Sequence, residues 1–162
     1  IVSVRRRESG GNVTGDLTAQ AGLTALTARR NLTGDLSVTG KLGTVSVGGG
    51  ITGNRVDVNG GGARLLRAGG RIENVTVTVD QTLALTLAGS DLHNTSIDGG
   101  GLGKVIVKGG IHEDDSDGDQ DYIRAREGRF FVRDSTLNGW VDEETEHWFG
   151  DGEPDGVRAW SG

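Results

Sequence analysis

An aliphatic pattern that recurs at a short, nearly constant interval constrains the fold of this chain more than any other feature. The segment Leu42–Ile51 reads LGTVSVGGGI, and Leu102–Ile111 reads LGKVIVKGGI. Further copies start at Leu23, Ala63 and Thr82, so that the five copies follow one another at almost equal spacing. Internal repeats of about 20 residues or more are typical of solenoids, in which each repeat forms one coil and stacks on the next.

Each copy carries apolar residues at the same places, with a Val-x-Val alternation that is typical of strands. In the clearest copy they are Leu42, Val45, Val47, Ile51, Val56 and Val58. Alternation places both valines of a pair on one face of a strand, and the glycines between pairs allow the chain to turn. One coil cannot bury such a face, but stacked coils cover one another. The sequence therefore predicts an all-β fold, a parallel β-helix (β-solenoid), from about residue 12 to residue 111.

The same alignment makes finer predictions about individual positions. It assigns Val75 and Val77 to the places of Val56 and Val58 in the copy before. It also puts the polar residue Thr82 at an inward place and leaves an apolar residue, Leu65, facing outward.

Asparagine and aspartate form a second periodic series, which recurs at the same interval as the aliphatic pattern. Its members are Asp16, Asp35, Asn54, Asn74 and Asn94. Both residue types tolerate a left-handed backbone and hydrogen-bond their own turn, and stacked amides can bond along a ladder. We interpret the series as a structural ladder at one corner of the solenoid.

The composition changes near residue 112. Residues 1–111 hold 12 Lys/Arg and 8 Asp/Glu, whereas residues 112–162 hold 5 and 15, so that the net charges of +4 and −10 add up to −6. The seven aromatic residues all follow residue 121. We therefore divide the chain into solenoid coils (1–111), an inserted acidic loop (112–121), and one or more terminal coils with an atypical C-terminal cap (122–162).

Apolar residues resume after the acidic loop. Ile123 and Ala125 are expected to complete the coil that begins at Leu102. A further coil is expected from Phe130, Val132, Leu137 and Val141, since larger side chains suit a terminal coil that covers an open core.

Four aspartates at alternate positions of the acidic loop indicate a candidate calcium site. They are Asp115, Asp117, Asp119 and Asp121. Ca²⁺ takes six to eight oxygen ligands, but the EF-hand pattern fails because Gln120 stands where glycine is required. The alternative is a solvated loop that its like charges keep open. Calcium is the one cofactor that the sequence suggests.

Three tryptophans near the C-terminus are candidates for glycan stacking. They are Trp140, Trp148 and Trp160. The alternative interpretation is that they belong to the cap, because terminal repeats of solenoids are atypical.

Two segments of the chain resemble the Gly-rich β-helix repeats of very large bacterial surface proteins. These segments are NLTGDLSV at 31–38 and LGTVSVGGGI at 42–51. Filamentous-haemagglutinin-type adhesins and the repeat-rich exoproteins of planctomycetes carry repeats of this kind. The resemblance covers about residues 12–111 and implies a right-handed β-helix, secretion, and a role in attachment or in the cell envelope.

No motif in the chain indicates catalysis. There is no P-loop, no G-x-S-x-G elbow and no H-E-x-x-H sequence. Asp80 and Asp98, near one corner, are the closest candidates for paired carboxylates, although aspartate at a corner is common in turns. His93 and His112 are expected to stack on adjacent coils, where they either touch a metal or form a solvated turn. We assign no catalytic residue.

The sequence thus predicts a non-enzymatic structural or adhesive segment of a large secreted or cell-surface protein. Expected partners are glycans, cell-surface components, or further copies that pair through the exposed sheet edges at the solenoid ends. The basic runs at 5–7 and 29–30 are isolated, and together with the acidic tail this argues against nucleic acid as a partner. No apolar run has the length of a membrane span. The alternatives are a carbohydrate-active β-helix of the lyase or hydrolase type and a segment of a viral fibre.

Overall fold

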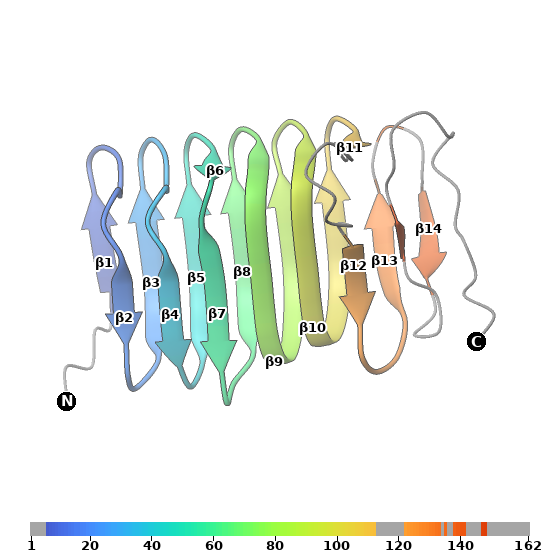
Figure 1. Ribbon diagram of the computed structural model, residues 1–162, viewed down its shortest axis with the longest axis horizontal. Helices are drawn as coiled ribbons and strands as arrows, with labels where there is room; N and C mark the ends of the chain where they lie inside the picture. Colours follow the sequence, from blue (N-terminus) through green and yellow to red (C-terminus); the bar gives the residue numbers. More distant parts are fainter. Residues whose placement is uncertain (1–5, 113–121, 134, 136–137, 142–146, 149–162) are drawn as a thin grey trace.

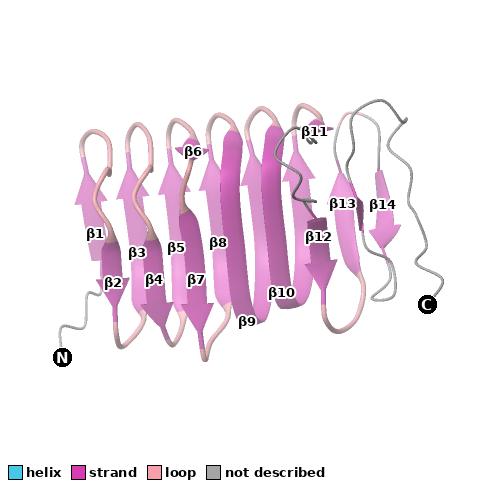
Figure 2. Cartoon of the chain, in the orientation of Figure 1, coloured by secondary structure: helices cyan, strands magenta, loops and turns pink. Residues whose placement is uncertain are grey.

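The computed structural model describes residues 6–112, 122–133, 135, 138–141 and 147–148. Within these residues the chain forms a 15-stranded sheet that winds along one axis (Figure 1). Figure 2 shows the strands running across the long axis of the molecule and the loops at its upper and lower edges, where the chain turns. The architecture is a β-solenoid of about 5 turns, with coils about 20 residues apart, as the repeat predicts. The right-handed winding that the resemblance implies stays a prediction.

The first broad face of the solenoid consists of parallel strands from every coil. They are β1 (Arg6–Ser9), β3 (Leu23–Ala28), β5 (Leu42–Val47), β8 (Ala63–Ala68), the second halves of β9 (Ile72–Ala88) and β10 (Leu92–Val107), and β13 (Phe130–Arg133). Cross-coil pairing places Leu26 beside Val45, and Val45 beside Leu66. Equivalent aliphatics of successive coils therefore lie directly next to one another.

The second broad face and a narrow face complete each coil. The second broad face contains β2 (Leu17–Ala19), β4 (Leu36–Thr39), β7 (Arg55–Asn59), the first halves of β9 and β10, and β12 (Tyr122–Ala125). The narrow face contains bridges at Val13 and Leu32, β6 (Ile51–Thr52), the starts of β9 and β10, and β11 (Ile111–His112).

One continuous hydrophobic core runs through the stack. Val45 and Val105, which lie on different coils with Leu66 and Thr86 between them, belong to the same buried cluster and are 0% and 1% exposed. The coils approach so closely that some positions admit only glycine. A Cβ at Gly43 would lie 2.0 Å from the carbonyl oxygen of Thr24, and one at Gly48 would lie 2.3 Å from that of Arg29.

The structure corrects the predicted start of one repeat. Leu83, not Thr82, pairs with Ala63 of the coil before and with Leu102 of the coil after, and Thr82 is exposed. The inward polar residue of this coil is Thr86, which is fully buried. Leu65 faces outward and is half-buried, as expected.

A second correction concerns the valines of the next broad strand. Val56 and Val58 pair with Val77 and Val79. The predicted match to Val75 and Val77 is therefore wrong by two residues, which is one period of the alternation in a strand. Three alternating valines fit two registers equally well, and only the pairing between coils distinguishes them. Val75 fills an additional inward place, where it pairs with Thr95.

The solenoid ends in antiparallel pairs. Ile123 and Ala125 are buried and complete the coil that begins at Leu102, as predicted. The predicted further coil is confirmed for β13, which pairs parallel to β10. The rest of that prediction is wrong, because β14 (Asn138–Val141) runs antiparallel to β13, with Val141 opposite Phe130. β15 (His147–Trp148) is likewise antiparallel to β12. Leu137 lies outside the described residues.

Candidate functional site

Several predicted site residues belong to parts of the chain that the structure does not describe. Residues 113–121, which include the four candidate calcium ligands, lie outside the described residues, as does Trp160. Trp140 lies on β14 opposite Phe131, and Trp148 lies on β15 opposite Tyr122. The calcium site and the glycan-stacking role of the tryptophans therefore stay predictions. In the part of the chain that is described, no group of three or more histidine, aspartate or glutamate side chains is arranged to hold a metal ion.

Two of the predicted ladder residues bond from coil to coil through their carboxylates. The backbone N–H of Asp35 donates to Asp16 Oδ1 (3.0 Å), and the N–H of Arg55 donates to Asp35 Oδ1 (2.8 Å). Each side-chain oxygen therefore accepts a hydrogen bond from the backbone of the following coil, which satisfies a corner N–H that turns out of the sheet.

The three asparagines of the series occupy different places. Asn54 is buried, and its Nδ2 donates to the carbonyl oxygen of Gly34 (3.0 Å). Asn74 and Asn94 adopt left-handed φ angles of 54° and 44°, in register with Gly53 at 60°. The even spacing in sequence conceals this division, because the corner before Val56 is one residue longer than the corner before Leu36.

A second ladder lies at the entrance to the narrow face and was not predicted. Oδ1 of Asn12, Asn31 and Asp91 accepts the backbone N–H of Asn31 (3.1 Å), Gly50 (2.9 Å) and Gly110 (3.2 Å), respectively. Each of the three acceptors directly precedes the aliphatic residue that starts the narrow face. That position in the repeat is the signal by which the series could have been found.

A cluster of charged and imidazole side chains, here the corner cluster, covers the narrow face near the C-terminal coils. Its members are Arg71, Glu73, Asp91, His93 and His112. The two histidines stack on adjacent coils, as expected, with ring centroids 6.2 Å apart and planes inclined by 46°. His93 Nδ1 lies 4.0 Å from Glu73 Oε1, and His112 Nε2 lies 4.0 Å from Asp91 Oδ1.

The Asp91 carboxylate of the corner cluster accepts hydrogen bonds through both of its oxygens. The Ser90 hydroxyl, which donates to Asp91 Oδ2 at 2.8 Å, lowers the pKa of Asp91 below its usual value of 3.8, and so does the N–H of Gly110. Arg71, whose Nη2 lies 3.6 Å from Asp91 Oδ2, and His112 add smaller electrostatic contributions, and partial burial opposes all of these effects. The carboxylate is thus stabilised in its ionised form.

Substitution of Asp91 by asparagine should reduce the dependence of stability on pH in the acid range. A depressed pKa in the folded state contributes stability that is present above the unfolded pKa and is lost as the pH falls through the folded value. Asp91→Asn should therefore lower the free energy of unfolding near neutral pH and flatten its decline below about pH 4. Urea unfolding at several pH values measures both effects.

Ser90→Ala is the matched variant for this experiment, because it removes the largest cause of the shift and keeps the carboxylate. It should produce part of the same loss. Identical pH profiles for Asp91→Asn and the unsubstituted chain would contradict the assignment.

Asp98, on the second broad face, joins the last coil to the one before it. Its Oδ2 accepts a hydrogen bond from Arg124 Nη2, and its Oδ1 lies 3.1 Å from Arg126 Nε. Arg126 also donates to the carbonyl oxygen of Val79 (2.8 Å), and the Arg124 guanidinium lies 4.9 Å from the centroid of the Tyr122 ring. Arg124 and Arg126 belong to the segment that follows the acidic loop, so this network connects chain on both sides of that loop.

Asp80, the other candidate carboxylate, is also engaged at its corner. Its Oδ2 accepts the backbone N–H of Gly60 at 2.6 Å. Both Asp80 and Asp98 accept hydrogen bonds that tie adjacent coils together.

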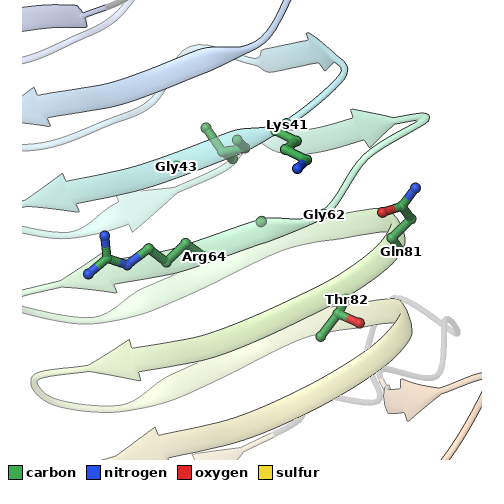
Figure 3. Close-up of a pocket in the computed structure, with 8 residues that line it drawn as sticks. Lys41, Gly43, Gly62, Arg64, Gln81 and Thr82 are labelled. Atoms are coloured by element: carbon green, nitrogen blue, oxygen red, sulfur yellow. The ribbon is translucent and has the colours of Figure 1, made fainter.

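An open depression lies at the edge of the first broad face (Figure 3). It has a volume of about 340 Å³, and its lining comes from three successive coils: Lys41, Leu42, Gly43, Gly62, Ala63, Arg64, Gln81 and Thr82. Leu42 and Ala63 are buried beneath it, while the side chains of Lys41, Arg64 and Gln81 are exposed around it. The sequence signal for this site is the pair of glycines, 43 and 62, which lie two residues from Lys41 and Arg64, respectively.

The fold and its sites define the class of the protein, which is the parallel β-solenoid. Comparison with family models, with curated proteins and with solved structures yields no match to this chain. Across the part of the chain that the structure describes, no helix is long and apolar enough to cross a membrane.

Proposed function

We propose that this chain is a non-enzymatic structural or adhesive solenoid segment of a large extracellular or cell-surface protein. The observation that carries the proposal is that the carboxylates of the coils stabilise the stack. Every aspartate and glutamate between residues 9 and 112 accepts a hydrogen bond or forms an ion pair: Asp16, Asp35, Asp57, Glu73, Asp80, Asp91 and Asp98. Most of these contacts join one coil to the next.

The geometry of the stack also supports a structural role. Coils separated by about 4.8 Å present equivalent residues in rows along the molecule, so that one surface motif is repeated at a fixed spacing. Such a surface suits a glycan or another cell-surface component that is itself repetitive. Within the described residues, strand β1 is paired with β3 alone. A strand that is paired on one side can pair with another strand on the other, so assembly from coil to coil between molecules is a second proposed means of attachment.

Calcium binding by the acidic loop remains part of this proposal. Alternate aspartates on a loop can supply the oxygen ligands that Ca²⁺ prefers. A bound cation would offset the repulsion between the four carboxylates of residues 115–121.

The test of the function is incubation of the chain with acidic and neutral polysaccharides, with and without Ca²⁺. We expect no release of reducing ends or of unsaturated products from any polymer. Cleavage that disappears in Asp98→Asn or in the double variant Asp117→Ala/Asp119→Ala would replace this proposal with a carbohydrate-active enzyme. A trimeric mass in solution would instead favour a fibre segment.

A further inference from the structure

The first broad face differs in charge from the rest of the solenoid. Its strands β3, β5 and β8 and the second halves of β9 and β10 contain no aspartate or glutamate, whereas β1, in the first coil of the same face, contains Glu8. Their outward side chains are small, hydroxyl-bearing, aliphatic or cationic, and the cations are Arg64, Arg67 and Lys104. Lys41 lies at the edge of the same face, one residue before β5. The carboxylates of these coils lie on the second broad face, on the narrow face and at the corners.

These four cations have no acidic partner within the described residues. No carboxylate oxygen there lies within 4.0 Å of the side-chain nitrogens of Lys41, Arg64, Arg67 or Lys104. By contrast, Arg55 on the second broad face is paired with Asp57 at 3.0 Å. The positive charge of the first broad face is therefore available to an anion from outside the molecule.

The depression lies among these cations and adds neutral polar groups. Figure 3 shows Lys41, Arg64, Gln81 and Thr82 around it, on three successive coils. Gly62 has no side chain to fill the depression, and a Cβ at this position would lie only 2.7 Å from the carbonyl oxygen of Thr82. The surface of the hollow is mostly apolar, and two cations, an amide and a hydroxyl are among the residues that line it.

We propose that the depression and the cations of the first broad face bind an anionic polysaccharide, which deepens the adhesive role proposed above and rests on it. The ammonium and guanidinium groups pair with the carboxylates or sulfates of the polymer, and the Gln81 amide and Thr82 hydroxyl bond its sugar hydroxyls. Leu65 and Leu85, half-buried in neighbouring coils of this face, offer apolar contact to the C–H groups of the sugar rings. Single-stranded nucleic acid fits less well, since residues 1–121 contain no phenylalanine, tyrosine or tryptophan on which bases could stack.

The experiment measures binding of the full chain to four labelled probes at low salt. The probes are an oligogalacturonate, a sulfated dextran, a neutral dextran and a single-stranded DNA. The test variant is Lys41→Ala/Arg64→Ala, both exposed residues, and the matched control is Arg55→Ala/Arg71→Ala, which removes the same charge from the second broad face and the narrow face. Unchanged thermal midpoints show that the variants remain folded.

We expect the chain to bind one or both anionic glycans and not the neutral dextran, with an affinity that falls as salt rises. The test variant should weaken this binding by about tenfold, the size expected for the loss of two exposed charge contacts, and the control by less than about twofold. A difference between the two anionic glycans identifies carboxylate or sulfate as the recognised group.

Three results would overturn the assignment: no binding of either anionic glycan, equal loss in the test and control variants, or tighter binding of DNA through the same residues. Each of these leaves the structural role intact. Release of sugar products during the incubations would instead contradict the non-enzymatic role, while the effects of the variants on binding would still report on the site.

Discussion

Deletion of residues 62–81 should leave a folded solenoid that is shorter by one coil. Ala63 pairs with Leu42 on one side and with Leu83 on the other, so the deletion brings Leu83 onto Leu42. Ile51 and Leu92, which both pair with Ile72, likewise become neighbours. Because each coil contacts mainly its two neighbours, the remaining stack keeps its inward residues and its hydrogen bonds.

The matched control deletes only part of a coil, residues 62–66. This change places Arg71 and Glu73 at the inward places of Leu66 and Ala68. Each lost aliphatic contact is worth about 1.5–3 kcal/mol, and unpaired charges in the core cost several kcal/mol more. Since small proteins are stable by only about 5–15 kcal/mol, we expect this variant to lose cooperative folding.

Circular dichroism and urea unfolding distinguish the two deletions. The whole-coil variant should keep its β-sheet spectrum and a cooperative transition, with an m-value reduced in proportion to the lost surface. Loss of that transition in the whole-coil variant, or its survival in the part-coil variant, would refute the description of the coils as interchangeable units.

Replacement of Phe130 by alanine should destabilise the protein by about 3–5 kcal/mol. Phe130 is 0% exposed and is among the largest fully buried side chains. It lies on β13, which pairs parallel to β10 on one side and antiparallel to β14 on the other. Its loss would open a cavity where the stacked core ends.

Phe131→Ala is the control for this substitution, because the Phe131 side chain is only half-buried, on the opposite face of the same strand. We expect a smaller loss, since less apolar surface is re-exposed. Chemical unfolding of both variants gives the comparison. A loss below about 1 kcal/mol for Phe130→Ala would show that the core does not depend on this ring.

The fold could be predicted because one repeat pattern determines both strand and stacking. Leu42, Val45 and Val47 face inward in the predicted way, and the same offsets recur in neighbouring coils. The errors arose where sequence alone permits two registers. Thr82 and Leu83 are adjacent in the chain, and the valines from 75 to 79 fit two alignments, so that hydrogen bonding between coils selects the register.

The side-chain networks were harder to predict than the strands. Asp98 contacts Arg124 and Arg126 across the inserted acidic loop, and the loop interrupts the repeat, so that no periodicity relates the residues on its two sides. The repeat pattern does not predict the depression for a different reason. It favours corners for the glycines, whereas Gly43 lies within strand β5, where a Cβ would lie 2.0 Å from the carbonyl oxygen of Thr24 in the previous coil.

The direction in which the coils stack has a mechanical consequence. Tension applied to the two ends of the chain acts on the outermost coils first, since interior coils are bonded on both sides. Each coil that detaches would release roughly 65–70 Å of extended chain while shortening the rod by only about 5 Å. Such a molecule lengthens in nearly equal steps under load and limits the peak force transmitted through whatever it connects.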